Sequence, residues 1–337
     1  MNKIYLFIFA VITLVPYGAH AQDLNITNSR YFPLYINPAG TGHFLGTLRL
    51  GGNLRGQDSE FMTDGYRTAS VFLDATSRVA LRKYDWTGFG IQLYHDDAGT
   101  LPLTTTGILM SASYHFSFDK KYRNVLSIGA QYGTIQKKID PLKLVLESDA
   151  TGTGNKDRPF LTDYKSSTND LNAGIMFRSM LTESKTLTMG LSVYHILQPY
   201  HKGIKSSNVI DRRYTLHSSL LFDITKNVSM QSRIILSKSG FASNFMFQDI
   251  VFFKLDKKKN NDNMIYAGIG YRLQDALQIM AGIRYKGIDV GIAYDLTVSD
   301  KAQYNRGMGG LEIGFYKIFN IRHKPKVTPV LLCPEKL

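Results

Sequence analysis

Cysteine is almost missing from this chain: Cys333, near the C-terminus, is the single one among 337 residues. An internal disulfide is therefore excluded, which leaves a free thiol or an intermolecular pair. Long apolar runs are also scarce. The run Ile4–Val15 is too short to cross about 30 Å of hydrocarbon. With 44% hydrophobic residues and a mean hydropathy of -0.14, the chain is too polar for a bundle of membrane helices.

Catalytic motifs are lacking as well. The chain has no G-x-S-x-G elbow and no H-E-x-x-H metal motif, and its eight histidines are scattered. Ser192 and His195 could belong to a membrane-embedded hydrolase, but only geometry defines such a site. The segment 149–157 resembles a calcium loop without the required register, and Gly268-Ile269-Gly270 lies inside a predicted strand. We therefore predict no catalytic residue, no cofactor and no metal site.

Acidic residues are outnumbered by basic ones, and the formal net charge is +13. Nucleic-acid binding would need a basic stripe with interleaved aromatic residues, which the chain lacks. Many cations lie in predicted turns, such as Lys120 and Lys121, or at alternate strand positions, such as Arg233, Arg272 and Arg284. We predict that they charge the lumen and rim of a barrel, with lipopolysaccharide or an acidic partner surface as counterion. No nucleic-acid partner is expected.

The prominent feature of the chain is strict alternation of apolar residues with small or polar ones. In the segment 288–295, Ile288, Val290, Ile292 and Tyr294 share one face of an extended strand, and Asp, Gly, Ala and Asp share the other. Such segments recur about fourteen times, near residues 43–55, 66–79, 86–96, 103–118, 123–139, 169–181, 186–197, 211–223, 227–238, 242–254, 263–273, 276–286, 287–297 and 307–319. The pattern predicts an all-β, antiparallel, up-and-down barrel in an outer membrane, with about 14 strands.

A secreted β-sandwich would alternate too. Its strands usually have about five or six residues, whereas most segments here are near the 9–11 that a tilted membrane strand needs. Connector lengths also favour the barrel, because short ones, such as 119–122 and 182–185, fall on one side and the longest, 140–168, on the other. The turn Lys254–Asp262 is an exception, since it is long for the side with short turns. Inward positions mix Arg and Tyr with Gly, so we expect a narrow, filled lumen.

Four regions follow from these patterns. Residues 1–21 have the positive start, apolar stretch and small-x-small ending of a signal peptide. Residues 22–42 contain Pro33 and Pro38 and are expected to form an irregular periplasmic arm. Residues 43–319 would be the transmembrane barrel. Residues 320–337 contain three prolines and would form a periplasmic tail.

The arm carries the pattern by which the chain resembles a known family. Its segment Pro33-Leu34-Tyr35-Ile36-Asn37-Pro38-Ala39-Gly40-Thr41-Gly42 resembles the PLYxNPAxxG signature of the PorP/SprF family, outer-membrane proteins of the type IX secretion and gliding machinery of Bacteroidota. Further segments match in order along the chain, among them Gly190–Pro199, Gly270–Arg272, Ile292–Asp295 and Cys333-Pro334. The family-motif positions are Pro33, Asn37, Pro38, Ala39, Gly42, His195, Gln198, Pro199, Tyr271, Arg272, Tyr294 and Asp295.

Two motifs depart from the family pattern. The usual YRxQW after the first strand appears as Leu54-Arg55-Gly56-Gln57-Asp58, and the HE near the last strand is reduced to Leu311-Glu312. The resemblance implies a non-enzymatic barrel in the cell outer membrane that supports export or surface anchoring of large cargo proteins such as adhesins. Its implied partners are outer-membrane lipid, the cargo and the periplasmic ring proteins of the system. A general porin or small-solute channel is the alternative.

Overall fold

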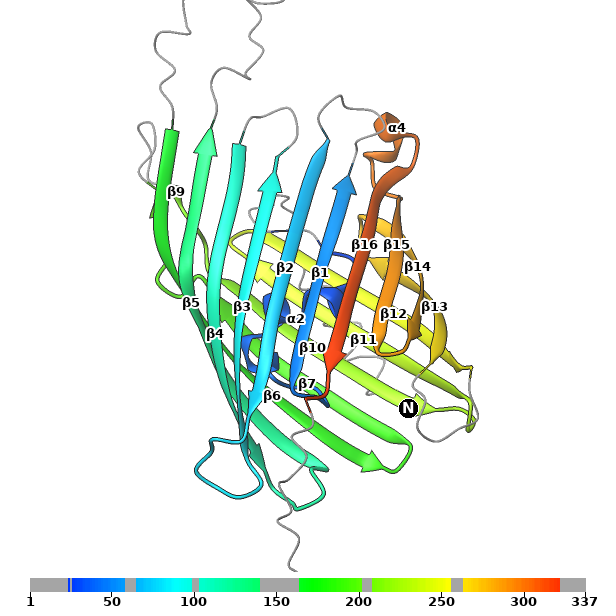
Figure 1. Ribbon diagram of the computed structural model, residues 1–337. Coiled ribbons are helices and arrows are strands. Elements are labelled where there is room, and N and C mark those ends of the chain that lie inside the picture. Colours follow the sequence, from blue (N-terminus) through cyan, green and yellow to red (C-terminus); the bar gives the residue numbers. More distant parts are fainter. Residues whose placement is uncertain are drawn as a thin grey trace, which may run out of the picture.

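The computed structural model describes residues 24, 26–57, 65–98, 103–139, 164–201, 208–255 and 263–321. Fourteen antiparallel strands close into one barrel, in which β1 pairs with β16 (Figure 1). These strands are β1 (Leu48–Gln57), β2 (Tyr66–Ser77), β3 (Trp86–Asp97), β4 (Leu103–Ser117), β5 (Asn124–Ile139), β6 (Tyr164–Thr182), β7 (Lys185–Tyr194), β10 (Arg213–Asp223), β11 (Val228–Ser239), β12 (Ala242–Lys254), β13 (Met264–Arg272), β14 (Ala276–Tyr285), β15 (Ile288–Thr297) and β16 (Met308–Phe319). The predicted all-β barrel and its strand number are confirmed.

Alternation along each strand separates an oily outer face from a polar inner one. In β15, Val290 and Ile292 are exposed on the outside, whereas Asp289 and Asp295 are buried. A side-chain period of two produces this separation, and an apolar outer surface is the one that lipid covers. No helix of the described residues is long and apolar enough to cross a membrane.

The two ends of the barrel differ. We call turn end the end that carries the connections 78–85, 118–123, 183–184, 224–227 and 286–287, and loop end the opposite one. At the loop end lie the helix α4 (Ala302–Asn305) and a small sheet of β8 (Tyr200–His201) and β9 (Asn208–Val209). Three strand ends differ from the predicted ones by three residues or more. β6 begins at Tyr164 instead of residue 169. β7 stops at Tyr194 because His195 has a positive φ of 57°, and β1 starts only after Gly42 and Gly46, which also have positive φ.

The N-terminal segment forms three short helices, η1 (Ser29–Tyr31), α2 (Pro33–Ile36) and η2 (Pro38–Gly40). They lie between the front and back walls of the barrel (Figure 1). Tyr31, Leu34 and Ala39 have no exposed surface. The described part of the predicted arm thus lies inside the barrel rather than beyond its end, because the inward polar side chains of the wall need hydrogen-bond partners.

The compartment that we assign to the arm, like the division into regions, stays a prediction. The predicted signal peptide 1–21 lies outside the described residues. So do the tail from residue 322, Cys333 and most of the 140–168 connection.

Candidate functional site: an arm seated in the lumen

Local chemistry shapes the arm before any contact with the wall. Pro33 and Pro38 stand at the first positions of α2 and η2, where a missing N–H costs no hydrogen bond. Between the two helices, the Asn37 side chain accepts a hydrogen bond of 2.9 Å from the Ala39 backbone N–H. Asn37 is therefore an N-cap, and the motif residues Pro33, Asn37, Pro38 and Ala39 encode a compact double turn.

Asn37 also holds this double turn against the wall. Its Nδ2 donates to the backbone oxygens of Ile175 at 3.0 Å and Leu191 at 3.2 Å, and lies 3.0 Å from His217 Nε2. The approach needs glycine on the wall, since a Cβ at Gly190 would lie 2.7 Å from Asn37 Nδ2. The contacts join three strands, β6, β7 and β10, to one side chain of the arm.

A second close approach lies on β5. A Cβ at Gly129 would lie 2.6 Å from the Ala39 N and the Pro38 O, which are backbone atoms. Ala39 has no exposed surface, so neither partner has room to move aside. Glycine at an inward position thus marks a place where the arm's backbone touches the wall. The sequence showed these glycines, but gave no sign of what they face.

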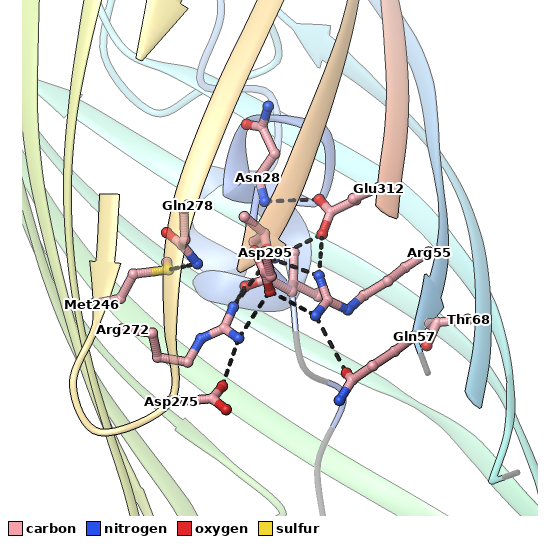
Figure 2. Close-up of polar contacts among 12 residues, drawn as sticks. Asn28, Arg55, Gln57, Thr68, Met246, Arg272, Asp275, Gln278, Asp295 and Glu312 are labelled. Atoms are coloured by element: carbon pink, nitrogen blue, oxygen red, sulfur yellow. Dashed lines mark hydrogen bonds and ion pairs between the residues drawn. The ribbon is translucent and has the colours of Figure 1, made fainter. Parts of the chain in front are cut away.

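At the loop end, four charged side chains form a buried network around the start of the arm (Figure 2). Arg55 lies 2.8 Å from Asp295 and 3.3 Å from Glu312, and all three side chains are at most 4% exposed. Arg272 lies 3.1 Å from the same Asp295 oxygen. Arg55, Arg272, Asp295 and Glu312 are named here the loop-end network. Two cations and two anions balance its charge, as buried charges require.

The arm closes this network. The Glu312 carboxylate accepts backbone N–H groups of Thr27 and Asn28, both at 2.7 Å (Figure 2). The Thr27 hydroxyl donates to Asp295 at 2.7 Å and accepts from Arg55 at 2.7 Å. Bonds to ionised groups are shorter and stronger than neutral ones, so the network both fixes the arm and is completed by it.

Arg55 and Glu312 lie in the two motifs that seemed to depart from the family pattern. Leu54-Arg55 and Leu311-Glu312 keep the charged residue of each motif, and the register places Arg55 opposite Glu312 on β1 and β16. Sequence reasoning missed both as site residues, together with Thr27. The signal was present, since each charge occupies an inward position of a strand.

A second cluster surrounds Asp289, nearer the turn end. Its carboxylate accepts from Arg30 at 3.0 Å, Arg284 at 2.9 Å and the hydroxyls of Tyr31 at 2.7 Å and Tyr316 at 3.0 Å. The arm supplies Arg30 and Tyr31, whereas β14, β15 and β16 supply the others. This cluster fixes the arm at a point where its chain turns back toward the loop end.

The end of the arm is held at the turn end. The Gly42 N–H donates to Asp74 at 2.7 Å, and Asp74 also pairs with Arg49 at 2.7 Å. The Gly42 carbonyl accepts from the indole of Trp86 at 3.1 Å. Gly42 has φ +67°, and a Cβ there would meet Gly88 Cα at 2.6 Å, so only glycine fits this motif position.

The remaining motif residues separate into two groups. Arg272 and Asp295 face inward and pair, whereas their neighbours Tyr271 and Tyr294 stand on the outer face of the alternation. His195, Gln198 and Pro199 form a turn after β7, in which Gln198 N–H donates to the His195 carbonyl at 2.9 Å and Pro199 O accepts from Ile210 at 3.0 Å. The structure therefore does not bring this turn into the loop-end network.

His195 is buried, and its Nδ1 lies 3.0 Å from Asp170. The Ser192 hydroxyl donates instead to the Ile36 carbonyl of the arm at 2.7 Å. Ser192 thus has a structural partner in the arm, which argues against its use as a nucleophile beside His195. Within the described residues, no group of three or more His, Cys, Asp or Glu could hold a metal ion.

We expect Asn37→Ala to lower the free energy of unfolding by about 1–2 kcal/mol, through loss of a helix cap and of the bonds to the wall. Urea unfolding followed by heat-modifiable gel mobility measures the change. Asn227→Ala, in an exposed turn at the turn end, is the matched control and should be neutral. Equal stability of the two variants would contradict the assigned role of Asn37.

A family model described as type IX secretion system membrane protein PorP/SprF matches residues 19–315 of this chain. No curated protein gives a significant match. Among solved structures, the Ralstonia pickettii toluene transporter TbuX is similar with a TM-score of 0.50 at 10% identity, over 92% of this chain and 98% of that one. The CymD monoaromatic hydrocarbon channel gives 0.49 at 12% identity, over 90% and 96%. At these identities the likeness concerns the fold alone.

Proposed function

Because the chain belongs to the PorP/SprF family of type IX secretion system membrane proteins, we propose that it is a non-enzymatic component supporting export or surface anchoring of large cargo proteins, such as adhesins. The protein is an outer-membrane barrel, and its family is one of secretion system membrane proteins, not an enzyme family. The observation that carries the proposal is the seated arm, whose Tyr31, Leu34 and Ala39 have no exposed surface.

An arm that several clusters of contacts hold inside the lumen is expected in a component of a secretion system rather than in a diffusion channel. A general porin needs a water-filled passage, whereas here the family signature segment 33–42 occupies the lumen and is hydrogen-bonded to strands on several sides. Periplasmic ring proteins are proposed as partners at the turn end, and cargo at the loop end. The orientation that places these ends rests on the lengths of the connectors.

A deletion strain tests this function. We expect deletion to abolish surface display of type IX cargo, with unchanged uptake of small solutes, and the intact gene to restore display. Affinity isolation of the tagged protein from outer membranes should recover cargo and periplasmic ring proteins. Normal cargo display together with slower solute uptake would instead support the porin alternative.

A further inference from the structure

The connection between β2 and β3, residues 78–85, is an ordered loop at the turn end. Asp85 is buried and accepts from the Tyr114 hydroxyl at 2.9 Å and the Ser117 N–H at 3.0 Å. Arg82 pairs with Asp85 at 3.5 Å and donates to the Ser117 carbonyl at 2.7 Å. These contacts fix the loop to β4, so its exposed side chains have defined positions.

The loop lies against the outer, lipid-facing side of the wall. The Leu81 N–H donates to the Tyr114 hydroxyl at 2.9 Å, and the Thr87 hydroxyl donates to the Val79 carbonyl at 3.0 Å. Tyr114 and Thr87 alternate with inward residues, so both stand on the outside of the barrel. Tyr114 also packs on Phe116 with ring centroids 4.4 Å apart, an aromatic pair of the kind found where a membrane meets water.

The exposed side chains of this loop are apolar at its tip and basic on both sides of the tip. Val79 is 79% exposed and Leu81 is 90% exposed. Arg78 and Lys83, on either side, are exposed cations. Such a combination matches the boundary of a bilayer, where aliphatic side chains enter the acyl region and cations meet phosphates.

The neighbouring turn, between β4 and β5, extends the same surface. It adds the exposed residues Phe118, Lys120 and Lys121. Its one acid, Asp119, accepts the backbone N–H groups of Arg123, Asn124 and Lys121, and these bonds lower the pKa of its carboxyl. Asp119 is thus engaged with backbone groups, and the surface as a whole is cationic.

We infer that residues 78–83 form an interfacial anchor that binds anionic phospholipid headgroups, with Val79 and Leu81 inserted beside them and Arg78 and Lys83 on the phosphates. The geometry against the lipid-facing wall favours a lipid over a soluble protein as the occupant. This role is independent of the proposed function in secretion, since it concerns how the barrel sits in its bilayer.

Bromolipid quenching in proteoliposomes tests the anchor. Leu81→Trp, with Val79→Trp as a second probe, places a reporter at the tip, and the parent with its single Trp86 gives the background. We expect brominated phosphatidylglycerol to quench the tip more strongly than brominated phosphatidylcholine at the same mole fraction. Adding Arg78→Gln or Lys83→Gln should each lower this preference about fivefold, equivalent to about 1 kcal/mol per cation near an anionic surface.

Tyr304→Trp, on α4 at the loop end, is the matched control, because its side chain is highly exposed but does not lie on the lipid-facing wall. It should be quenched by aqueous acrylamide and little by either lipid. Equal quenching of the tip by both lipids would overturn the headgroup assignment. A tip open to acrylamide and untouched by lipid would overturn the anchor as a whole.

Discussion

Gly129→Val should release the arm from β5 and open the barrel to ions. The Cβ alone would lie 2.6 Å from backbone atoms of Pro38 and Ala39, and valine adds two methyl groups. Overpacking a filled site costs about 1–3 kcal/mol, which shifts the balance between seated and released arm by about 5- to 150-fold. Planar-bilayer recordings should therefore show ion-conducting openings about 5- to 150-fold more often than in the parent.

The fluorescence of the single tryptophan also reports release of the arm. Trp86 donates to the Gly42 carbonyl at 3.1 Å and stacks near His43, so an arm that leaves its place exposes the indole to water. We expect a red shift of its emission in Gly129→Val. The control is Ala130→Val, one residue along β5 on the outer face, which should change neither emission nor conductance. A silent Gly129→Val barrel, correctly folded, would refute the seated arm.

Among the substitutions proposed here, Asp295→Ala should lower the free energy of unfolding most. It would leave Arg55 and Arg272, both about 5% exposed or less, without the carboxylate that they share. Removing one partner of a buried ionic group typically costs about 3–5 kcal/mol, since the remaining charge stays buried. Urea unfolding of the purified barrel measures the difference.

Asp275→Ala is the matched control for that experiment. Asp275 pairs with the same Arg272 at 3.0 Å, but its side chain is 38% exposed. Pairs near solvent are worth about 0–1 kcal/mol, so this variant should lose little. If both aspartate variants lost equally little stability, the loop-end network would not hold the arm in place.

The barrel could be predicted from sequence because its rule is local. Side chains two residues apart share a face, so an alternating stretch such as 288–295 reveals its strand without knowledge of its neighbours. Closure then follows, since an open edge of such length would leave backbone groups unpaired in lipid. Even the short turns were placed correctly, because each breaks the alternation.

The position of the arm inside the lumen could not be predicted, because it depends on contacts between residues far apart in the sequence. Thr27 meets Glu312 across 285 positions of sequence, and Asn37 meets Ile175 across 138. Proline and asparagine indicated an irregular arm, whereas the structure forms three short helices there, and this local chemistry does not state what the backbone touches. The partners of the arm are the inward-facing glycines and charged residues of the wall. Only the closed barrel places them opposite the arm.

The point of attachment sets a direction for any withdrawal of the arm. Residues 43–47 join Gly42 to the start of β1, and five residues reach at most about 18 Å. The wall traced by the ten residues of β1 is about 33 Å long. Because this linker at the turn end is so short, the segment 33–42 cannot pass out completely at the loop end. The arm can leave the closed barrel completely only through the turn end, where residues 43–47 attach it to β1. A partner that pulls the arm out would therefore have to act from the turn end.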